Sequence, residues 1–206
     1  MLSVVCIKWG DWLAEWVNIL RAMVGRHLRT PHEFVCLTDD PAGLDKEIRP
    51  IKITLPGWWG KMMLYAPDAD RLFADRILHL DVDVVITGDL TELVQFPSPY
   101  AAMRDWPRAI APPGCEKHMN SSCVVMDSGA RPEVWDAWVT MGSPTPREGC
   151  FYSDQTLVNR NGLKVDLLPE EWVRSYKLHK MADNGPGDDC RVAVFHGRPK
   201  PWEGDD

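Results

Sequence analysis

The stretch ILHLDVDVVITGD, residues 77–89, decides how the rest of the chain is interpreted. Apolar residues lead up to Asp81-Val82-Asp83 and follow it until a Gly-Asp pair breaks the run, a pattern typical of a buried strand with two carboxylates at its carboxyl end. In an extended segment, residues i and i+2 point to the same side, about 7 Å apart at their Cα atoms. Asp81 and Asp83 can therefore turn their oxygens onto one divalent cation, and such a cation can neutralise a diphosphate.

The alternative is that the two aspartates have a structural role and bind no metal. Asp-x-Asp triplets also occur by chance at strand ends and in turns, where the carboxylates cap helices or stay in water. An open α/β sheet, however, binds its ligands in the crevice beyond the carboxyl ends of its strands. Asp81 and Asp83 would lie at that place, so the setting favours a ligand site.

The composition is that of an ordinary globular protein. With 206 residues, the chain is most simply one domain spanning 1–206, and its content of charged residues (26%) and hydrophobic residues (45%) is typical. The net charge of −7 argues against a nucleic-acid binder that gains its affinity by neutralising phosphates, so no nucleic-acid partner is expected.

Two further sequence features bear on the cellular compartment. No apolar run reaches the roughly 18 residues of a membrane span, and Lys8 comes too early for the apolar region of a signal peptide. We therefore expect a soluble, cytoplasmic protein. The six cysteines show no C-x-x-C spacing, and we expect Cys6 and Cys36 to be small buried hydrophobic residues.

The chain begins with a β-α-β pattern. Residues 3–7 and 33–38 are apolar runs typical of strands, and between them apolar residues recur at helical spacing from Leu13 to Val24. Further strands are expected at residues 49–55, 101–106, 121–126, 165–168 and 192–195, and helices at 58–64, 90–94, 132–139 and 154–161. The order predicts an α/β fold with a mixed, mainly parallel central sheet flanked by helices.

Two segments before the acidic stretch are candidate ligand contacts. Trp9, Gly10 and Asp11 follow the first expected strand, so they open onto the same crevice as Asp81. Lys61 lies in the expected helix 58–64, where it can either reach a phosphate or point into solvent, and the sequence favours solvent.

The last expected strand runs directly into residues 196–202, HGRPKPW. A histidine at a strand end is more often structural than metal-bound. Here, however, His196 is followed by Gly197, which lets a ligand approach the backbone, and by Lys200, which can serve as a point charge for phosphate.

This run resembles the closing H-x-G-x-x-K-P-W motif of the family 8 glycosyltransferases, the group of glycogenin and the lipopolysaccharide galactosyltransferases. HLDVDVVITGDL resembles their Y-L-D-x-D-x-x-x-x-G-D-L segment, while Asn120-Ser121-Ser122 and Ser153-Asp154-Gln155 are similar to their N-x-G and D-Q blocks. The segments IKWGDWLAEWVN, TDDPAGL, PGWWGKMMLY, SYKLH and FHGRPKPW resemble a group of uncharacterised bacterial glycosyltransferase-like proteins. The resemblance implies a GT-A type fold, that of the nucleotide-diphospho-sugar transferases.

The resemblance also implies a metal site. Asp81 would touch the metal and the nucleotide ribose, Asp83 would hold Mn²⁺, and His196 would be the third protein ligand. Two carboxylates and one imidazole suit Mn²⁺, with Mg²⁺ as the alternative metal, and the ligand types also admit Zn²⁺.

The remaining roles follow from the same resemblance and concern the donor. Gly197 and Lys200 would contact the diphosphate, and the base would lie against the loop of Trp9, Gly10 and Asp11. The sugar end is implied to involve three more residues: Asn120 at the sugar or acceptor, Asp154 lining the sugar site, and Gln155 on the reacting face of the anomeric carbon. The two serines after Asn120 replace the small residues often found there, which leaves the shape of the sugar pocket open.

The function implied by the resemblance is that of a metal-dependent, retaining hexosyltransferase. It would move a sugar from a nucleotide diphosphate sugar, with a UDP-sugar as the expected donor, to a glycan, lipid or protein acceptor. Whether Asp154 acts as a covalent nucleophile or the acceptor attacks from the same face stays open. A nucleotidyltransferase is one rival, although the loop after the first strand lacks the Gly-rich basic character that holds a triphosphate. A non-catalytic nucleotide-sugar or glycan-binding protein is the other.

Overall fold

A computed structural model describes residues 1–53, 55, 57–105, 119–143, 154–160 and 163–203. The sequence predicts a loop at 107–119; its residues 107–118 lie outside the described residues, whereas Met119 begins β7. The expected loop at 144–149 and the expected helix cap Ser153 also lie outside them. The helices are α1 (Ala14–His27), the 3-10 helix η1 (Gly57–Tyr65), α2 (Ala69–Leu72), α3 (Thr91–Val94), α4 (Pro132–Thr140), α5 (Asp154–Arg160) and α6 (Met181–Asn184). The strands are β1 (Leu2–Lys8), β2 (Glu33–Thr38), β3 (Ile48–Lys52), β4 (Arg76–Leu80), β5 (Val84–Ile86), β6 (Tyr100–Arg104), β7 (Met119–Asp127), β8 (Asp166–Leu167), β9 (Val173–Ser175) and β10 (Val192–Val194).

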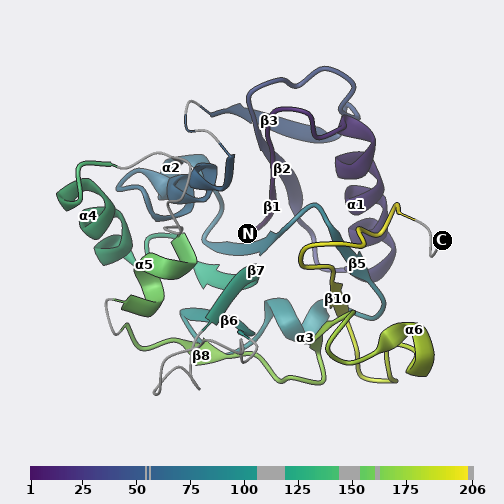
Figure 1. Cartoon of the computed structure of the whole chain (residues 1–206). Helices are drawn as coiled ribbons and strands as arrows, with labels where there is room; N and C mark the ends of the chain where they lie inside the picture. Colours follow the sequence, from purple (N-terminus) through teal and green to yellow (C-terminus); the bar gives the residue numbers. More distant parts are fainter. Residues whose placement is uncertain (54, 56, 106–118, 144–153, 161–162, 204–206) are drawn as a thin grey trace.

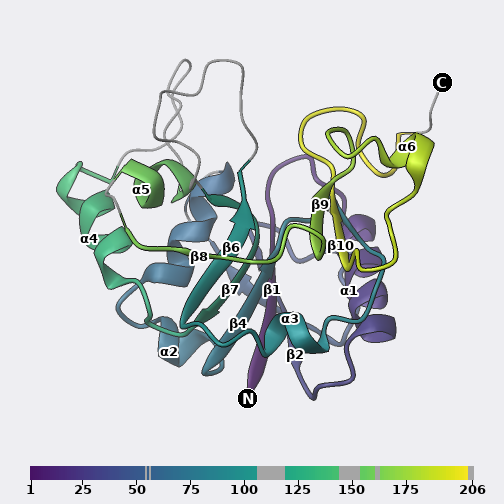
Figure 2. The ribbon, with the colours of Figure 1, turned by 90° about the horizontal axis from the view of Figure 1, so that it is seen from below.

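A seven-stranded sheet runs through the described part of the chain in the order β3-β2-β1-β4-β7-β6-β8 (Figure 1). Strands β3, β2, β1 and β4 are parallel, β7 is antiparallel to both β4 and β6, and β8 is parallel to β6. Helices lie on both sides of this sheet (Figure 2). The predicted fold class, α/β with a mixed and mainly parallel central sheet, is confirmed.

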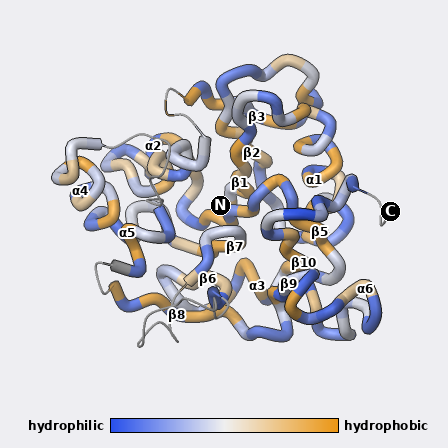
Figure 3. The backbone as a smooth tube through the Cα atoms, viewed as in Figure 1, coloured by the Kyte–Doolittle hydropathy of each residue, from blue (hydrophilic) through white to orange (hydrophobic). Residues whose placement is uncertain are grey.

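The alternation of side chains along the strands divides the core between the two faces of the sheet. Val4 and Cys6 of β1 pack in one hydrophobic cluster with Val17 and Leu20 of α1. Val5, between them, belongs to a second cluster, which includes residues of η1, α4 and α5. This separation follows from the period of two along a strand. Figure 3 shows the hydrophobic stretches of the chain gathered at the central strands.

The sequence predicted that the acidic stretch forms one strand, and this prediction is wrong. β4 ends at Leu80 in the central sheet, and β5 begins at Val84 in a separate three-stranded sheet of order β5-β10-β9. The backbone N–H of Asp81 still donates to the carbonyl of Ser122, at 2.9 Å, after which the chain turns away. Both halves are apolar because each is buried in its own sheet, so the pattern could not reveal the break.

Smaller differences concern short elements. The expected helix at 58–64 is a 3-10 helix, and α2, β9 and α6 were not predicted. Cys6 and Cys36 are fully buried, as expected, and free, as are Cys123 and Cys190. No helix in the described part of the chain is long and apolar enough to cross a membrane.

Candidate active site

The two aspartates lie in the turn that leaves the carboxyl end of β4. Asp81 comes directly after the strand, Val82 is buried, and Asp83 precedes β5. The side chain of Asp81 is 27% exposed and that of Asp83 is 13% exposed. The turn therefore holds two carboxylates, two residues apart in the chain, largely out of water. It lies at the sheet edge where α/β folds bind ligands.

Lys61 neutralises the first of these carboxylates. Its ammonium group lies 2.8 Å from Oδ1 of Asp81, and its side chain is 8% exposed. The same ammonium donates to the backbone carbonyl of Ser121 at 3.2 Å and to its Oγ at 3.1 Å. The expectation that Lys61 points into solvent is therefore wrong. Its segment forms η1, which packs into the core beside β1 and so turns the lysine toward the sheet edge.

Lys200 neutralises the second carboxylate. Its ammonium group forms an ion pair with Oδ2 of Asp83, although 117 residues separate the two along the chain. β10 brings them together because it pairs antiparallel with β5, with Val194 opposite Val84, so the segment that follows β10 lies beside the acidic turn. The closing motif and the acidic stretch, which the sequence placed at one site, do meet there.

Charge and burial act on the two carboxyl groups in different ways. Burial favours the neutral form of Asp81, but the combined effect of Lys61 and His79 outweighs burial and holds the pKa of Asp81 well below its usual range. For Asp83, burial and repulsion from Asp81 raise the pKa, against the attraction of Lys200. The pKa of Lys61 is raised, since attraction by Asp81 and Asp154 exceeds the effect of burial. The turn thus holds two neighbouring carboxylates whose negative charge a cation can neutralise.

A polar network connects the acidic turn to the start of α5. Ser121, which accepts from Lys61, donates through its Oγ to Oδ1 of Asp154 at 3.3 Å, and Asp154 is buried. The backbone N–H of Ser121 also lies 3.4 Å from Oε1 of Gln155. The amide of Gln155 in turn donates to Oδ2 of Asp105 at 3.1 Å. Gln155 is therefore held at both ends of its side chain amide.

Asn120 lies on β7, next to this network, and is buried. Its Oδ1 accepts from the backbone N–H of Ser122 at 2.9 Å, so the side chain folds back on its own strand. Because β7 is antiparallel to β4, with Cys123 opposite Leu80, residues 120–122 flank the acidic turn. Four sequence blocks that lie far apart in the chain, around residues 61, 81, 121 and 154, thus form one continuous polar site.

His196 follows β10 of the three-stranded sheet. Its Nδ1 is 3.2 Å from the hydroxyl of Ser175 on β9, and the ring is half-buried. Gly197, which follows, is exposed and has a φ of +71°, a conformation that glycine adopts without strain. The backbone at Gly197 is therefore open to a ligand.

The loop after β1 shows two different environments. Trp9 is half-buried and packs against the core cluster on the η1 side of the sheet. Gly10 and Asp11 are exposed, and the N–H of Gly10 donates to Oδ2 of Asp39 at 3.2 Å, which joins the loops after β1 and β2. These residues lie at the carboxyl end of β1, as predicted, and so on the same edge as Asp81.

Solved structures of glycosyltransferases have the same arrangement of elements. The galactosyltransferase LgtC, solved with donor and acceptor sugar analogues, superposes with a TM-score of 0.67 and 16% identity, covering 98% of this chain and 90% of that one. A variant of LgtC with an active-site glutamine changed to glutamate gives a TM-score of 0.69 and 15% identity, with the same coverage. The chain has the GT-A fold of the glycosyltransferases.

Two longer proteins contain the same GT-A unit. The glycosyltransferase GlyE of Streptococcus pneumoniae TIGR4 matches with a TM-score of 0.68 and 17% identity, and the bifunctional glycosyltransferase WbbM with 0.70 and 14%. This chain spans 57% of GlyE and 46% of WbbM, about half of each. No protein-family model and no curated protein matches the sequence, so the likeness lies in the GT-A fold.

The metal ligands implied by the resemblance suit a divalent cation by type. Two carboxylates that repel each other and one imidazole are donors that Mn²⁺ accepts, and a cation would relieve the repulsion that raises the pKa of Asp83. Within the described residues, no three His, Cys, Asp or Glu side chains gather closely enough to hold a metal ion. The acidic side chains instead face Lys61 and Lys200.

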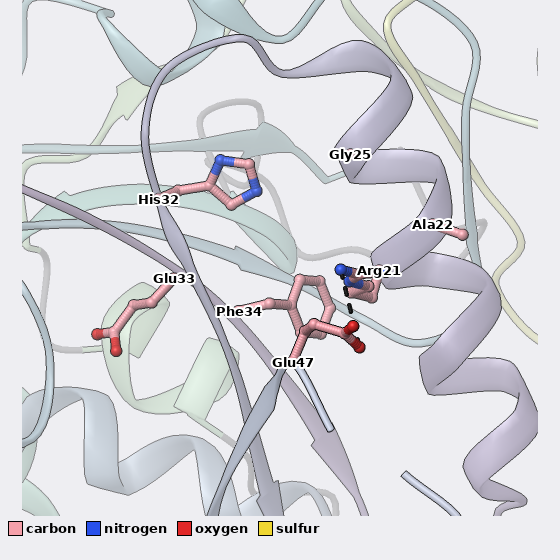
Figure 4. Close-up of a pocket in the computed structure, with 7 residues that line it drawn as sticks. All are labelled: Arg21, Ala22, Gly25, His32, Glu33, Phe34 and Glu47. Carbon is pink, nitrogen blue, oxygen red and sulfur yellow. Dashed lines mark ion pairs between the residues drawn. The ribbon is translucent and has the colours of Figure 1, made fainter. Parts of the chain in front are cut away.

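A hollow in the described part of the chain lies away from the acidic turn. Figure 4 shows its lining, which comes from α1, from the start of β2 and from the residue before β3: Arg21, Ala22, Gly25, His32, Glu33, Phe34 and Glu47. Glu33 pairs with Ser3, at the amino ends of the strands, whereas Asp81 follows the carboxyl end of β4. This hollow is therefore not part of the candidate active site.

The sequence assigned no contact to three polar groups at the site. His79 is fully buried on β4, two residues before Asp81. Its Nδ1 lies 3.1 Å from the carbonyl oxygen of Val5, and its Nε2 lies 3.4 Å from Oδ1 of Asp81. Ser121 and Asp105 complete the network around Gln155. The position of His79, two residues before Asp81 and so on the same side of the strand, was the available signal.

Proposed function

We propose that this protein is a glycosyltransferase that moves a sugar from a nucleotide diphosphate sugar to an acceptor. The observation that carries the proposal is the joining of Lys61, Asp81, Asp83 and Lys200 in one charged site at the carboxyl edge of the sheet. The GT-A fold supports it, since the solved proteins with this fold, LgtC, GlyE and WbbM, are glycosyltransferases.

The donor would lie along the edge of the sheet. Its base and ribose would lie near the loop of Trp9, Gly10 and Asp11, and its diphosphate near Gly197 and Lys200. We take a UDP-sugar as the donor to test first, because the family 8 resemblance implies it. Two observations support the placement of the diphosphate. Gly197 has an exposed backbone, and Lys200 has a positive charge that is paired with Asp83 in this structure.

A divalent cation, Mn²⁺ or Mg²⁺, would be held by Asp81, Asp83 and His196. When bound, it would neutralise the diphosphate and so stabilise the charge of the leaving group. Lys200 would leave Asp83 for the phosphate oxygens when the donor binds. Lys61 would stay with Asp81, since it is buried and also bonded to Ser121.

The reaction breaks the bond between the anomeric carbon and the phosphate oxygen, and the bonding electrons leave with the nucleoside diphosphate. An acceptor hydroxyl forms the new bond to the same carbon and gives up its proton. The main task of the protein is to stabilise the growing negative charge on the leaving group, and Lys200 is the side chain that would do so. We propose retention of configuration, on the strength of the family resemblance.

The sugar would lie between the acidic turn and α5. Asp154 and Gln155 face this space from the start of α5, and Asn120 flanks it from β7. Gln155 is fixed by Ser121 and Asp105, which suits a residue that must hold one position against a reacting carbon.

A hydrolysis assay followed by NMR tests the function. The protein is incubated with UDP-glucose, UDP-galactose, GDP-mannose and ADP-glucose, each with Mn²⁺ and with chelator. Release of the sugar in its original anomeric form, with one donor and only with metal, supports the proposal. If one nucleotide binds but no sugar is released with any acceptor supplied, the non-catalytic alternative gains support. If neither binding nor release occurs, the proposal fails.

A further inference from the structure

Three tryptophans tie the segment after β10 to α1. The ring of Trp202 stacks on that of Trp16, with centroids 4.3 Å apart and planes inclined by 14°. It meets Trp12 edge to face, at a centroid distance of 5.5 Å. Trp16 lies in the first turn of α1 and Trp12 just before it. Figure 1 shows this C-terminal segment, in yellow, running from β10 to α1. We call Trp12, Trp16 and Trp202 the tryptophan clamp.

Trp202 of the clamp and Lys200 belong to one closed turn. The backbone N–H of Lys200 donates to Oε2 of Glu203 at 2.9 Å, and the N–H of Glu203 donates to the carbonyl of Lys200 at 3.0 Å. Oε1 of Glu203 also lies 2.8 Å from Nη1 of Arg198. Trp202 lies inside this turn, so its ring is attached to the same closed backbone segment as Lys200.

The side chain of Lys200 touches the clamp as well. Its ammonium group lies 5.6 Å from the centroid of the Trp12 ring, in range of a cation–π contact, while it forms the ion pair with Asp83. Trp12 therefore contacts both Lys200 and Trp202. A lysine side chain has up to about 2 kcal/mol of rotamer entropy to lose on ordering, and a site that orders it beforehand binds its ligand more tightly.

We propose that the tryptophan clamp positions Lys200 at the acidic turn and thereby sets the affinity of the protein for a diphosphate. Its three members are positioning residues: none of them is assigned a contact with the donor. The part of the proposal that concerns the diphosphate rests on the proposed function, whereas the positioning of Lys200 does not.

Chemical labelling of Lys200 tests the positioning in the absence of any nucleotide. Acetylation of the folded protein is followed by mass spectrometry, with the exposed Lys52 as the internal reference. Trp16→Leu and Trp202→Leu should raise the labelling rate of Lys200 relative to Lys52 by about threefold or more, because an aromatic pair contributes roughly 0.5 to 1.5 kcal/mol beyond burial. Trp16→Phe, which keeps a stacking ring, should restore most of the protection.

Trp135→Leu is the matched control. Trp135 is also half-buried and meets another indole, that of Trp138, but it lies on α4 and away from Lys200. Its loss should leave the labelling of Lys200 unchanged. If Trp16→Leu or Trp202→Leu unfolds the protein, the milder Trp16→Phe and Trp202→Phe are compared with Trp135→Phe. Wild-type labelling in every folded clamp variant would overturn the proposal.

The second arm compares a nucleoside diphosphate with its nucleoside by calorimetry. With UDP and uridine as probes in Mn²⁺, Trp202→Leu should weaken UDP about tenfold and uridine by less than about twofold, since only UDP carries the phosphates that Lys200 would meet. Equal losses for both would contradict a role through Lys200. If unmodified protein binds neither probe, the proposed donor fails, and the labelling result still decides whether the clamp positions Lys200.

Discussion

The ammonium group of Lys61 lies 2.8 Å from Oδ1 of Asp81, and both side chains are largely buried. This pair joins η1 to the turn after β4, and Ser121 extends it to Asp154 at the start of α5. The first aspartate of the acidic turn is therefore built into the fold, while the second, Asp83, pairs with a lysine from the C-terminal segment. We therefore expect the two aspartates to differ in their effects on stability and on ligand binding.

Lys61→Met should destabilise the protein markedly. It leaves Asp81 without its counter-charge, and breaking a buried ion pair in this way costs about 3 to 5 kcal/mol in the free energy of unfolding. Denaturant unfolding measures the loss. Adding Asp81→Asn should recover part of it, because the unpaired charge is removed. Lys52→Met, at an exposed lysine of β3, is the control and should change stability by less than about 0.5 kcal/mol.

Asp83→Asn should abolish metal-dependent binding of the nucleotide while leaving the fold intact. Its carboxylate is an implied metal ligand, and its partner Lys200 can turn toward solvent when the charge is lost. Calorimetry with UDP in Mn²⁺ and in chelator checks this, with the exposed Asp70→Asn as control. An unchanged affinity for UDP in Mn²⁺ would remove Asp83 from the metal site.

Lys200→Ala should weaken a nucleoside diphosphate more than its nucleoside. A charge-assisted contact with phosphate contributes about 1.5 to 3 kcal/mol, so a loss of affinity for UDP of tenfold or more is expected, with uridine little changed. Lys46→Ala, at an exposed lysine before β3, should affect neither ligand. Parallel losses for UDP and uridine would show that Lys200 does not meet the phosphates.

Gln155→Ala should slow sugar transfer and spare nucleotide affinity. The side chain lies at the start of α5, bonded to Ser121 and Asp105, and we propose that it meets the sugar rather than the nucleotide. The turnover number should fall by about tenfold or more, as for loss of a group that acts in the transition state. Gln95→Ala, at an exposed glutamine after α3, is the control. A large loss of UDP affinity with normal turnover would place Gln155 elsewhere.

A pH dependence of stability is expected at the amino edge of the sheet. Glu33 accepts from Nε and Nη2 of Arg49, at 2.8 and 2.9 Å, and this pairing lowers the pKa of Glu33 against the effect of burial. A carboxyl group whose pKa is lower in the folded state adds stability above its unfolded pKa of about 4.3, and this gain disappears as the pH falls through the folded pKa.

Thermal unfolding of Glu33→Gln across pH checks that sign. The variant should melt below the wild type near neutral pH, and the two curves should converge in acid, below the lowered pKa of Glu33. Glu47→Gln is the control, since its contact with Arg21 is longer, at 4.0 Å, and exposed. A difference between Glu33→Gln and wild type that is constant over the whole pH range would contradict the assignment.

The sequence predicted the elements whose pattern is local. The β-α-β start was predicted because helical spacing between two apolar runs is visible within about 40 residues, and β1, α1 and β2 confirm it. The break between β4 and β5 was missed, because an apolar run looks the same whether one sheet buries it or two. α2, β9 and α6 have three or four residues each, too few for a periodic signal.

The candidate site depended on contacts between distant residues. Asp81, Asp83 and Lys200 were selected from motifs, and the structure confirms only that the acidic turn and the closing segment meet. Lys61 was placed in solvent because nothing near it in the sequence shows that its partners are Asp81, 20 residues on, and Ser121, 60 residues on. Strand pairing creates these contacts, and no local pattern contains them.

The most direct test of the central claim is a thermal-shift measurement with UDP, GDP, CDP and ADP and their common sugar conjugates, each with Mn²⁺ and with chelator. We predict that one nucleotide family raises the melting temperature only when metal is present, by the stabilisation that a ligand gains from binding the folded state alone. Loss of that rise in Asp83→Asn would place the nucleotide at the acidic turn. No rise with any nucleotide, in metal or in chelator, would contradict the proposal that this GT-A fold binds a nucleotide sugar.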